Sequence, residues 1–155
     1  MGEVKRALDS DHSGNRMTMI APYVTRAEYE CSCCHTLPPD LDTKRWLYDI
    51  FFAKFKEIRE EWGKPIQISS GYRCKKKNVA EGGKDISVHL FGLALDLNLP
   101  TVGDVFELDD LIETLHPDLR RGMYTTAYTF IHVDMGYTIV PRAMPEWVMG
   151  ARWTG

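Results

Sequence analysis

The sequence lacks the long apolar segments that membrane insertion or secretion requires. No stretch approaches the roughly 20 consecutive apolar residues of a membrane-spanning helix. Residues 1–16 are polar and contain no apolar core of the kind found in a signal peptide. We therefore expect a chain that is synthesised in the cytoplasm without a signal peptide and does not insert into a membrane.

A strong excess of charge is also missing, as are internal repeats and low-complexity segments. The 19 basic and 22 acidic side chains leave a net charge of −3, which argues against a nucleic-acid-binding surface driven by bulk charge. We interpret the short basic run at 73–77, RCKKK, as a solvated loop, with contact to an anionic substrate as the alternative. The 155 residues fit a flexible tail at 1–16 followed by one domain at 17–155, with a monomer favoured and the oligomeric state left open.

Cysteine is scarce, but its few copies are crowded. Three of the four cysteines lie in CSCCH at 31–35 and the fourth is Cys74. A structural disulfide is not expected in a reducing cytoplasm, and the spacing does not match the paired motifs of zinc ribbons. Free thiols are the favoured interpretation for Cys31, Cys33, Cys34 and Cys74. The alternative is a second, structural zinc bound by the three clustered cysteines and His35, with Cys74 as a further candidate ligand.

The remaining pattern predicts an α+β fold with a small, mostly antiparallel sheet flanked by helices. Residues 42–62 have helical periodicity and end before Gly63-Lys64-Pro65, and 103–117 form a second candidate helix. Strands are predicted at 65–70 and, with less support, within 137–148. The apolar stripe that should face the core from the first helix consists of Trp46, Ile50, Ala53 and Phe55.

Residues 86–99, ISVHLFGLALDLNL, carry His89 and Asp96 in an otherwise apolar segment. A buried carboxylate is costly unless it is paired or bound to a metal. From Leu93 onward leucines alternate with Ala94, Asp96 and Asn98, so Asp96 points away from the leucine face. Gly92 allows a bend that brings His89 back beside it. For two residues alone, a loop histidine and a salt-bridging carboxylate remain an open alternative.

A third donor occurs in residues 129–136, TFIHVDMG. Strand phasing places Phe130, His132 and Asp134 on one face, and the apolar residues between them on the other. Two histidines and a carboxylate form a catalytic zinc set when the fourth position stays open. The pattern therefore indicates one zinc ion held by His89, Asp96 and His132.

The motifs, in order, resemble those of the zinc D-alanyl-D-alanine peptidases, which share a fold with the D-Ala-D-Ala dipeptidases and the hedgehog signalling domain. The resemblance rests on SGYRC at 70–74, Asn78, the glycine pair 82–83, SVHLFGLALD at 87–96 and FIHVDMG at 130–136. It covers roughly residues 25–140. It implies that His89, Asp96 and His132 are the zinc ligands and that Arg73 faces the substrate.

The sequence also departs from that family. Several relatives carry a catalytic Glu or Asp three residues before the last ligand histidine, where this chain has Thr129. Asp134 could replace that base, or it could hydrogen-bond a ligand; both alternatives stay open. Arg73 offers a planar donor fork for a carboxylate or an oxyanion. Ser87 is a candidate substrate-binding residue, although Ser87 and Asn78 are better suited to shaping the loop.

The resemblance implies a zinc metallopeptidase that hydrolyses stem or cross-bridge peptides of bacterial peptidoglycan. The HxD ending resembles a branch found in cell-wall endopeptidases and phage lysins. Without a signal peptide, the chain fits release to the cell wall as a phage or prophage protein. The alternative function is a catalytically silent zinc-binding module, which Thr129 supports. Neither the bond that is cut nor the D,D or L,D specificity can be derived from the sequence.

Overall fold

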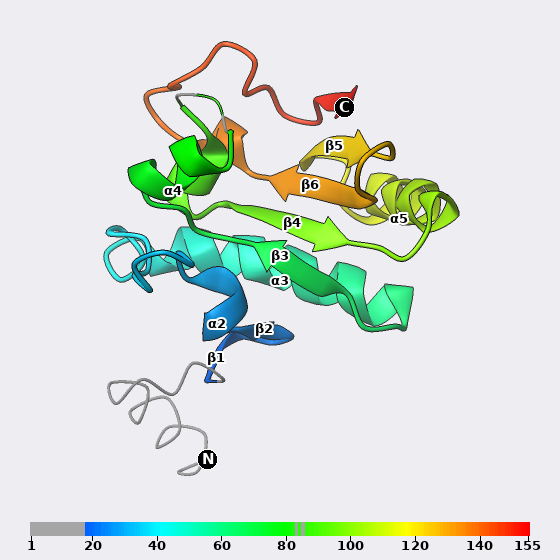
Figure 1. The fold of residues 1–155 in the computed structure, drawn as a ribbon, viewed down its shortest axis with the longest axis horizontal. Coiled ribbons are helices and arrows are strands. Elements are labelled where there is room, and N and C mark those ends of the chain that lie inside the picture. Colours follow the sequence, from blue (N-terminus) through cyan, green and yellow to red (C-terminus); the bar gives the residue numbers. More distant parts are fainter. Residues whose placement is uncertain (1–17, 83, 85) are drawn as a thin grey trace.

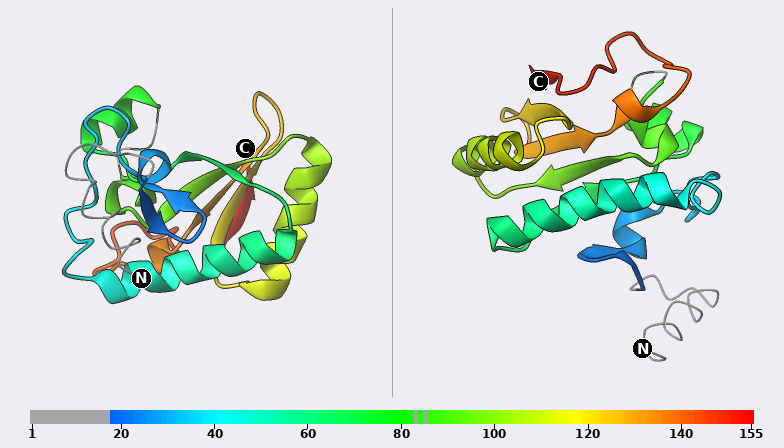
Figure 2. Two further views of the ribbon diagram at one scale, coloured as in Figure 1. Left: turned by 90° about the horizontal axis from the view of Figure 1, so that it is seen from below. Right: turned by 180° about the vertical axis from the view of Figure 1, so that it is seen from behind.

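The structure, a computed structural model, describes residues 18–82, 84 and 86–155. The expected tail at 1–16 lies outside the described residues. Figure 1 shows a central sheet with the long helix α3 lying across one side, and Figure 2 shows the same layering from below and from behind. None of the helices in the described part of the chain is long and apolar enough to cross a membrane.

The chain alternates helices and short strands. The α-helices are α2 (Arg26–Tyr29), α3 (Arg45–Trp62), α4 (Lys75–Ala80) and α5 (Val102–Leu115), and the 3-10 helices are η2 (Val88–Phe91) and η3 (Gly136–Thr138). The strands are β1 (Met19–Ala21), β2 (Val24–Thr25), β3 (Gln67–Ser70), β4 (Ala94–Asn98), β5 (Arg120–Tyr124), β6 (Phe130–Asp134) and β7 (Arg152–Thr154).

The main sheet has five strands in the order β3-β4-β6-β5-β7, and a separate hairpin pairs β1 with β2. Only the β5–β7 pair is parallel, while the other three pairs of the main sheet are antiparallel. The predicted α+β class with a small, mostly antiparallel sheet is confirmed.

The alternation predicted for β4 and β6 is confirmed by burial. Leu93, Leu95 and Leu97 are at most 2% exposed and belong to one core with α3 and α5. Ile131 and Val133 enter the same core from β6. Because side chains alternate along a strand, the polar residues between them point to the opposite face of the sheet.

Helix α3 begins three residues later than predicted, and its buried stripe differs from the prediction. Trp46 and Ile50 are 65% and 44% exposed, and Ala53 is exposed as well, so only Phe55 of the predicted stripe is in the core. The buried residues of α3 are Leu47, Tyr48, Phe51, Phe52, Phe55 and Ile58. At 100° per residue these positions form one broad face turned toward the sheet, and Trp46 lies outside it.

Two further expectations are wrong. Within the basic run at 73–77 only the first two residues lie in a loop, because the three lysines form the first turn of α4, capped by the Cys74 side chain. Residues 139–148, all described, contain no strand. The predicted strand at 65–70 and helix at 103–117 correspond to β3 and α5, with ends shifted by one or two residues.

Candidate metal centre

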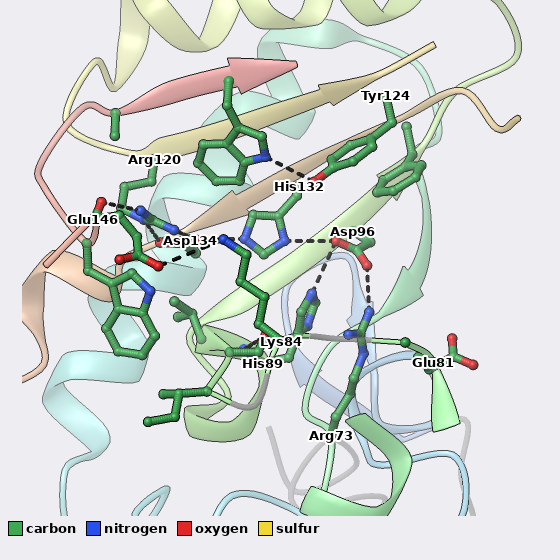
Figure 3. A pocket seen from close by; sticks show the side chains of 18 of the residues that line it. Arg73, Glu81, Lys84, His89, Asp96, Arg120, Tyr124, His132, Asp134 and Glu146 are labelled. Carbon is green, nitrogen blue, oxygen red and sulfur yellow. Dashed lines mark hydrogen bonds and ion pairs between the residues drawn. The ribbon is translucent and has the colours of Figure 1, made fainter. Parts of the chain in front are cut away.

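Three donors meet on the polar face of the sheet. In the β4–β6 pair, Asp96 lies directly opposite His132, and η2 brings His89 to the same place. One ligand atom from each of His89, Asp96 and His132 lies within 4.8 Å of the other two. Figure 3 shows the three side chains pointing toward one another. The sequence motif and the strand phasing therefore place the three predicted ligands together.

The ring of His89 is fixed by a backbone carbonyl. Its Nδ1 lies 2.6 Å from the oxygen of Gly71, and because a carbonyl only accepts, Nδ1 is the protonated nitrogen. Nε2, 3.2 Å from Oδ1 of Asp96, is left with its lone pair toward the cluster. Gly92 makes the required turn with a φ of 74°, in the left-handed region that favours glycine.

The ring of His132 is fixed in the same way by a carboxylate. Its Nε2 lies 2.6 Å from Oδ2 of Asp134, and its Nδ1 lies 3.0 Å from Oδ1 of Asp96. Hydrogen bonding at Nε2 selects the form in which Nδ1 carries a lone pair for a metal. Two such nitrogens and one carboxylate oxygen match the donor set of a zinc site with an open fourth position.

Burial and mutual contact shift the pKa of each group in the cluster. Burial lowers the pKa of His89, and the nearby Asp96 carboxylate offsets this only in part. Burial also acts to lower the pKa of His132, but hydrogen bonds to Asp134 and Asp96 outweigh it and raise that pKa to about 9. Burial raises the pKa of Asp96, yet His89 and His132 bring it well below its ordinary value. Asp96 is therefore an anion throughout the physiological range.

Asp134 is completely enclosed. Its Oδ1 accepts from Arg120 Nε and from the backbone N–H of Gly136, both at 2.8 Å, and its Oδ2 accepts from His132 and from a second Arg120 nitrogen at 3.2 Å. The side chain has no exposed surface. These contacts support the alternative in which Asp134 hydrogen-bonds a ligand over the one in which it is the base.

Arg73 lies beside the donor cluster. Its guanidinium donates to Asp96 Oδ2 at 3.0 Å, to Ser70 Oγ at 3.0 Å and to Asn78 Oδ1 at 3.3 Å. Asn78 is buried and also donates to the oxygen of Lys84 at 2.6 Å. Asn78 thus orients Arg73, in keeping with the shaping role expected for it.

The cluster opens into a cavity of about 660 Å³. Ser87 lines this cavity, and its Oγ accepts from the His89 backbone N–H at 3.2 Å, which caps η2. Thr129, at the position of the missing carboxylate, donates to the Leu99 oxygen at 2.6 Å. Among the described residues, Glu81 and Glu146 are the other carboxylates of the lining.

Two residues of the site were not found from the sequence. Arg120 makes the ion pair with Asp134, and Trp153 packs 5.6 Å from the His132 ring, centroid to centroid. Trp153 fits because Gly122 has no side chain: a Cβ there would lie 2.3 Å from its Nε1. The sequence held one signal for Arg120. Two adjacent arginines at 120–121 cannot both point to the same side of a strand, so one of them is expected to be buried and to need a carboxylate partner. The sequence held no comparable signal for Trp153, because β7 is only three residues long.

Comparison with protein families gives one match. Residues 23–134 match the model of a family described as Peptidase M15. The matched region includes the three donors, Arg73 and Asp134. A search of curated proteins finds no match to this chain.

Proposed function

The chain belongs to the peptidase M15 family of zinc-dependent metallopeptidases, and on that premise we propose that it hydrolyses peptide bonds in the stem peptides or cross-bridges of bacterial peptidoglycan. The cofactor of this family is zinc, and the donor set described above fits it. We assign His89, Asp96 and His132 as its ligands.

One observation carries the proposal: both histidines are locked at their far nitrogens, by Gly71 and by Asp134, so that their near nitrogens face Asp96 at the base of an open cavity. A closed structural site would have no such opening. When bound, zinc lowers the pKa of a water ligand toward 7 and polarises a peptide carbonyl.

The cavity suits a substrate that carries carboxylates. Three arginines and a lysine line it: Arg73, Arg120, Arg152 and Lys84. Arg120 engages both oxygens of the enclosed Asp134. Arg73 is also paired, with Asp96, but this pair places it directly beside the donor cluster, so we assign substrate binding to Arg73, whose planar fork matches a carboxylate or a developing oxyanion. Stem peptides of peptidoglycan are rich in carboxylates, which supports this substrate class.

Proton transfer needs a group other than Asp134, because its oxygens already accept four hydrogen bonds. Glu81 and Glu146 are the remaining carboxylates of the described lining. We propose that one of them accepts the proton of the attacking water and that Asp134 positions His132. Single Glu81→Gln and Glu146→Gln variants identify which one, since loss of a general base lowers turnover by roughly 10²–10⁴-fold.

The test is digestion of purified muropeptides followed by mass spectrometry, with zinc content measured on the same sample. New fragments with D,D or L,D cleavage would support the proposal and fix the bond. Zinc-loaded protein that leaves every muropeptide intact would instead favour the silent zinc-binding module, for which Thr129 is the main argument. Release to the cell wall as a phage or prophage protein is a further part of the proposal, tested by lysis of cells from without.

A further inference from the structure

The four cysteines converge at a second place in the molecule, beyond the zinc peptidase site. Cys31, Cys33 and Cys34 follow α2, and Cys74 caps the start of α4. The Sγ of Cys33 lies 3.5 Å from that of Cys31 and 3.3 Å from that of Cys74. All four sulfurs lie within 4.8 Å of one another. Two segments 43 residues apart along the chain thus bring their sulfurs together.

This packing resembles a tetrahedron more than two disulfides. Zinc–sulfur bonds of about 2.3 Å place the sulfurs of a tetrahedral site about 3.8 Å apart. The cysteines are unbridged, and Cys33 contacts two sulfurs at nearly equal distances. A disulfide would instead single out one partner at about 2.05 Å.

The surroundings favour thiolates. The backbone N–H of Cys74 donates to Cys31 Sγ, and that of Lys77 donates to Cys74 Sγ, each at 3.4 Å. Three lysines follow directly in α4, so positive charge adjoins the net negative charge that a zinc tetrathiolate carries.

We propose that the chain binds a second zinc ion, with a structural role, through four thiolates: Cys31, Cys33, Cys34 and Cys74. This site ties the end of α2 to the segment that carries Arg73. The same two segments are joined by a backbone hydrogen bond from Tyr72 to Tyr29 at 2.7 Å, and Arg73 donates its N–H to the His89 oxygen at 3.0 Å. The second zinc therefore holds Arg73 in place relative to the first.

Metal content of protein purified under reducing, zinc-replete conditions tests the proposal. Wild type should hold two equivalents of zinc, and the Cys33→Ser, Cys74→Ser and His132→Ala variants one each. Ser32→Ala, an exposed position between two of the cysteines, is the matched control and should retain two. One equivalent in wild type, or two in both cysteine variants, would overturn the proposal.

A measurement on wild type removes any dependence on variant folding. Titration with an organomercurial should release one equivalent of zinc as four thiols react, and the second equivalent should stay bound. Cobalt substitution should give intense sulfur-to-cobalt charge-transfer bands that persist in His132→Ala and disappear in Cys74→Ser. Four thiols that react without releasing metal, or thiols that react only after reduction, contradict the proposal in favour of free thiols or disulfides.

Discussion

The histidine cluster and the cysteine cluster bring donors together by different means. His89, Asp96 and His132 are positioned by strand register and by hydrogen bonds to their far sides, before any metal is considered. The cysteines lie on a loop and at a helix start, which one backbone hydrogen bond from Tyr72 to Tyr29 and the contacts of the sulfurs bring together. The sheet therefore organises the first site, whereas in the second, by our proposal, the metal organises the loops. Such a difference is typical of catalytic and structural zinc.

The largest effect should come from His132→Ala. It removes one of three protein ligands without disturbing the leucine core, so the variant should fold, lose the zinc of the histidine cluster and fall to background activity. Circular dichroism measures folding, zinc analysis measures metal content, and muropeptide digestion measures activity. His116→Ala is the control, because His116 only pairs with Glu57 on the surface. Full zinc and full turnover in His132→Ala would remove the ligand assignment.

Acidification should weaken zinc binding at the histidine cluster. The pKa of His132 is about 9, so below that pH a proton must leave the ring before a metal binds. The sign follows: affinity falls as pH falls, by about tenfold per unit, or roughly a hundredfold from pH 9 to 7. Competition with a chromophoric chelator measures it. A flat affinity across this range would contradict a ligand His132 whose pKa is raised by Asp134 and Asp96.

Asp134→Asn separates positioning from base catalysis. Weakening the hydrogen bond to His132 should lower zinc affinity roughly 10–100-fold, and saturating zinc should restore most turnover. A general base would leave turnover about a hundredfold down even at saturating zinc. Asp109→Asn is the matched control, because Asp109 is an equally buried partner of Arg121 in the contact with α5. Asp109→Asn should lower the free energy of unfolding without changing the zinc affinity.

The smallest effect is expected for Arg73→Lys. The ammonium keeps the charge but loses the fork that contacts Asp96, Ser70 and Asn78. Losing one charge-assisted hydrogen bond costs about 1.5 kcal/mol, or about tenfold in kcat/KM. Zinc content should not change. If zinc and turnover fall together, Arg73 supports the metal centre rather than the substrate.

Local alternation was enough to predict that Asp96 and His132 point to the polar face of the sheet, because both lie in strands whose other face is apolar and whose phase is unambiguous. It was not enough for contacts that depend on pairing. The ion pair of Arg120 with Asp134 requires the register of β5 on β6. Trp153 reaches His132 through the parallel pairing of β7 with β5. A strand of three residues is too short for its pairing to be predicted from the sequence.

The error in α3 has a different origin. Trp46, Ile50, Ala53 and Phe55 do follow helical spacing, but so do Tyr48, Phe51, Phe55 and Ile58, and only contact with the sheet decides between the two stripes. The sequence left the convergence of the cysteines only as an alternative, because nothing in their spacing places Cys74 beside the other three. Cys33 and Cys74 meet only because Gly71 is small enough for the chain to pass Tyr29, where a Cβ would come within 2.8 Å of its side chain.

The pairing of Asp96 with His132 has a consequence for folding. His89 and Asp96 are near neighbours in the chain, but the third donor arrives only when β6 docks on β4 in the observed alignment. A slip of one residue would turn His132 toward the core. A zinc ion that prefers the complete set would stabilise only the correct alignment, by about 4 kcal/mol at a thousandfold excess over its Kd. Zinc bound at this site would then add to the apolar packing of β4 and β6 that already selects the observed alignment, so that metal binding and correct strand pairing stabilise one another.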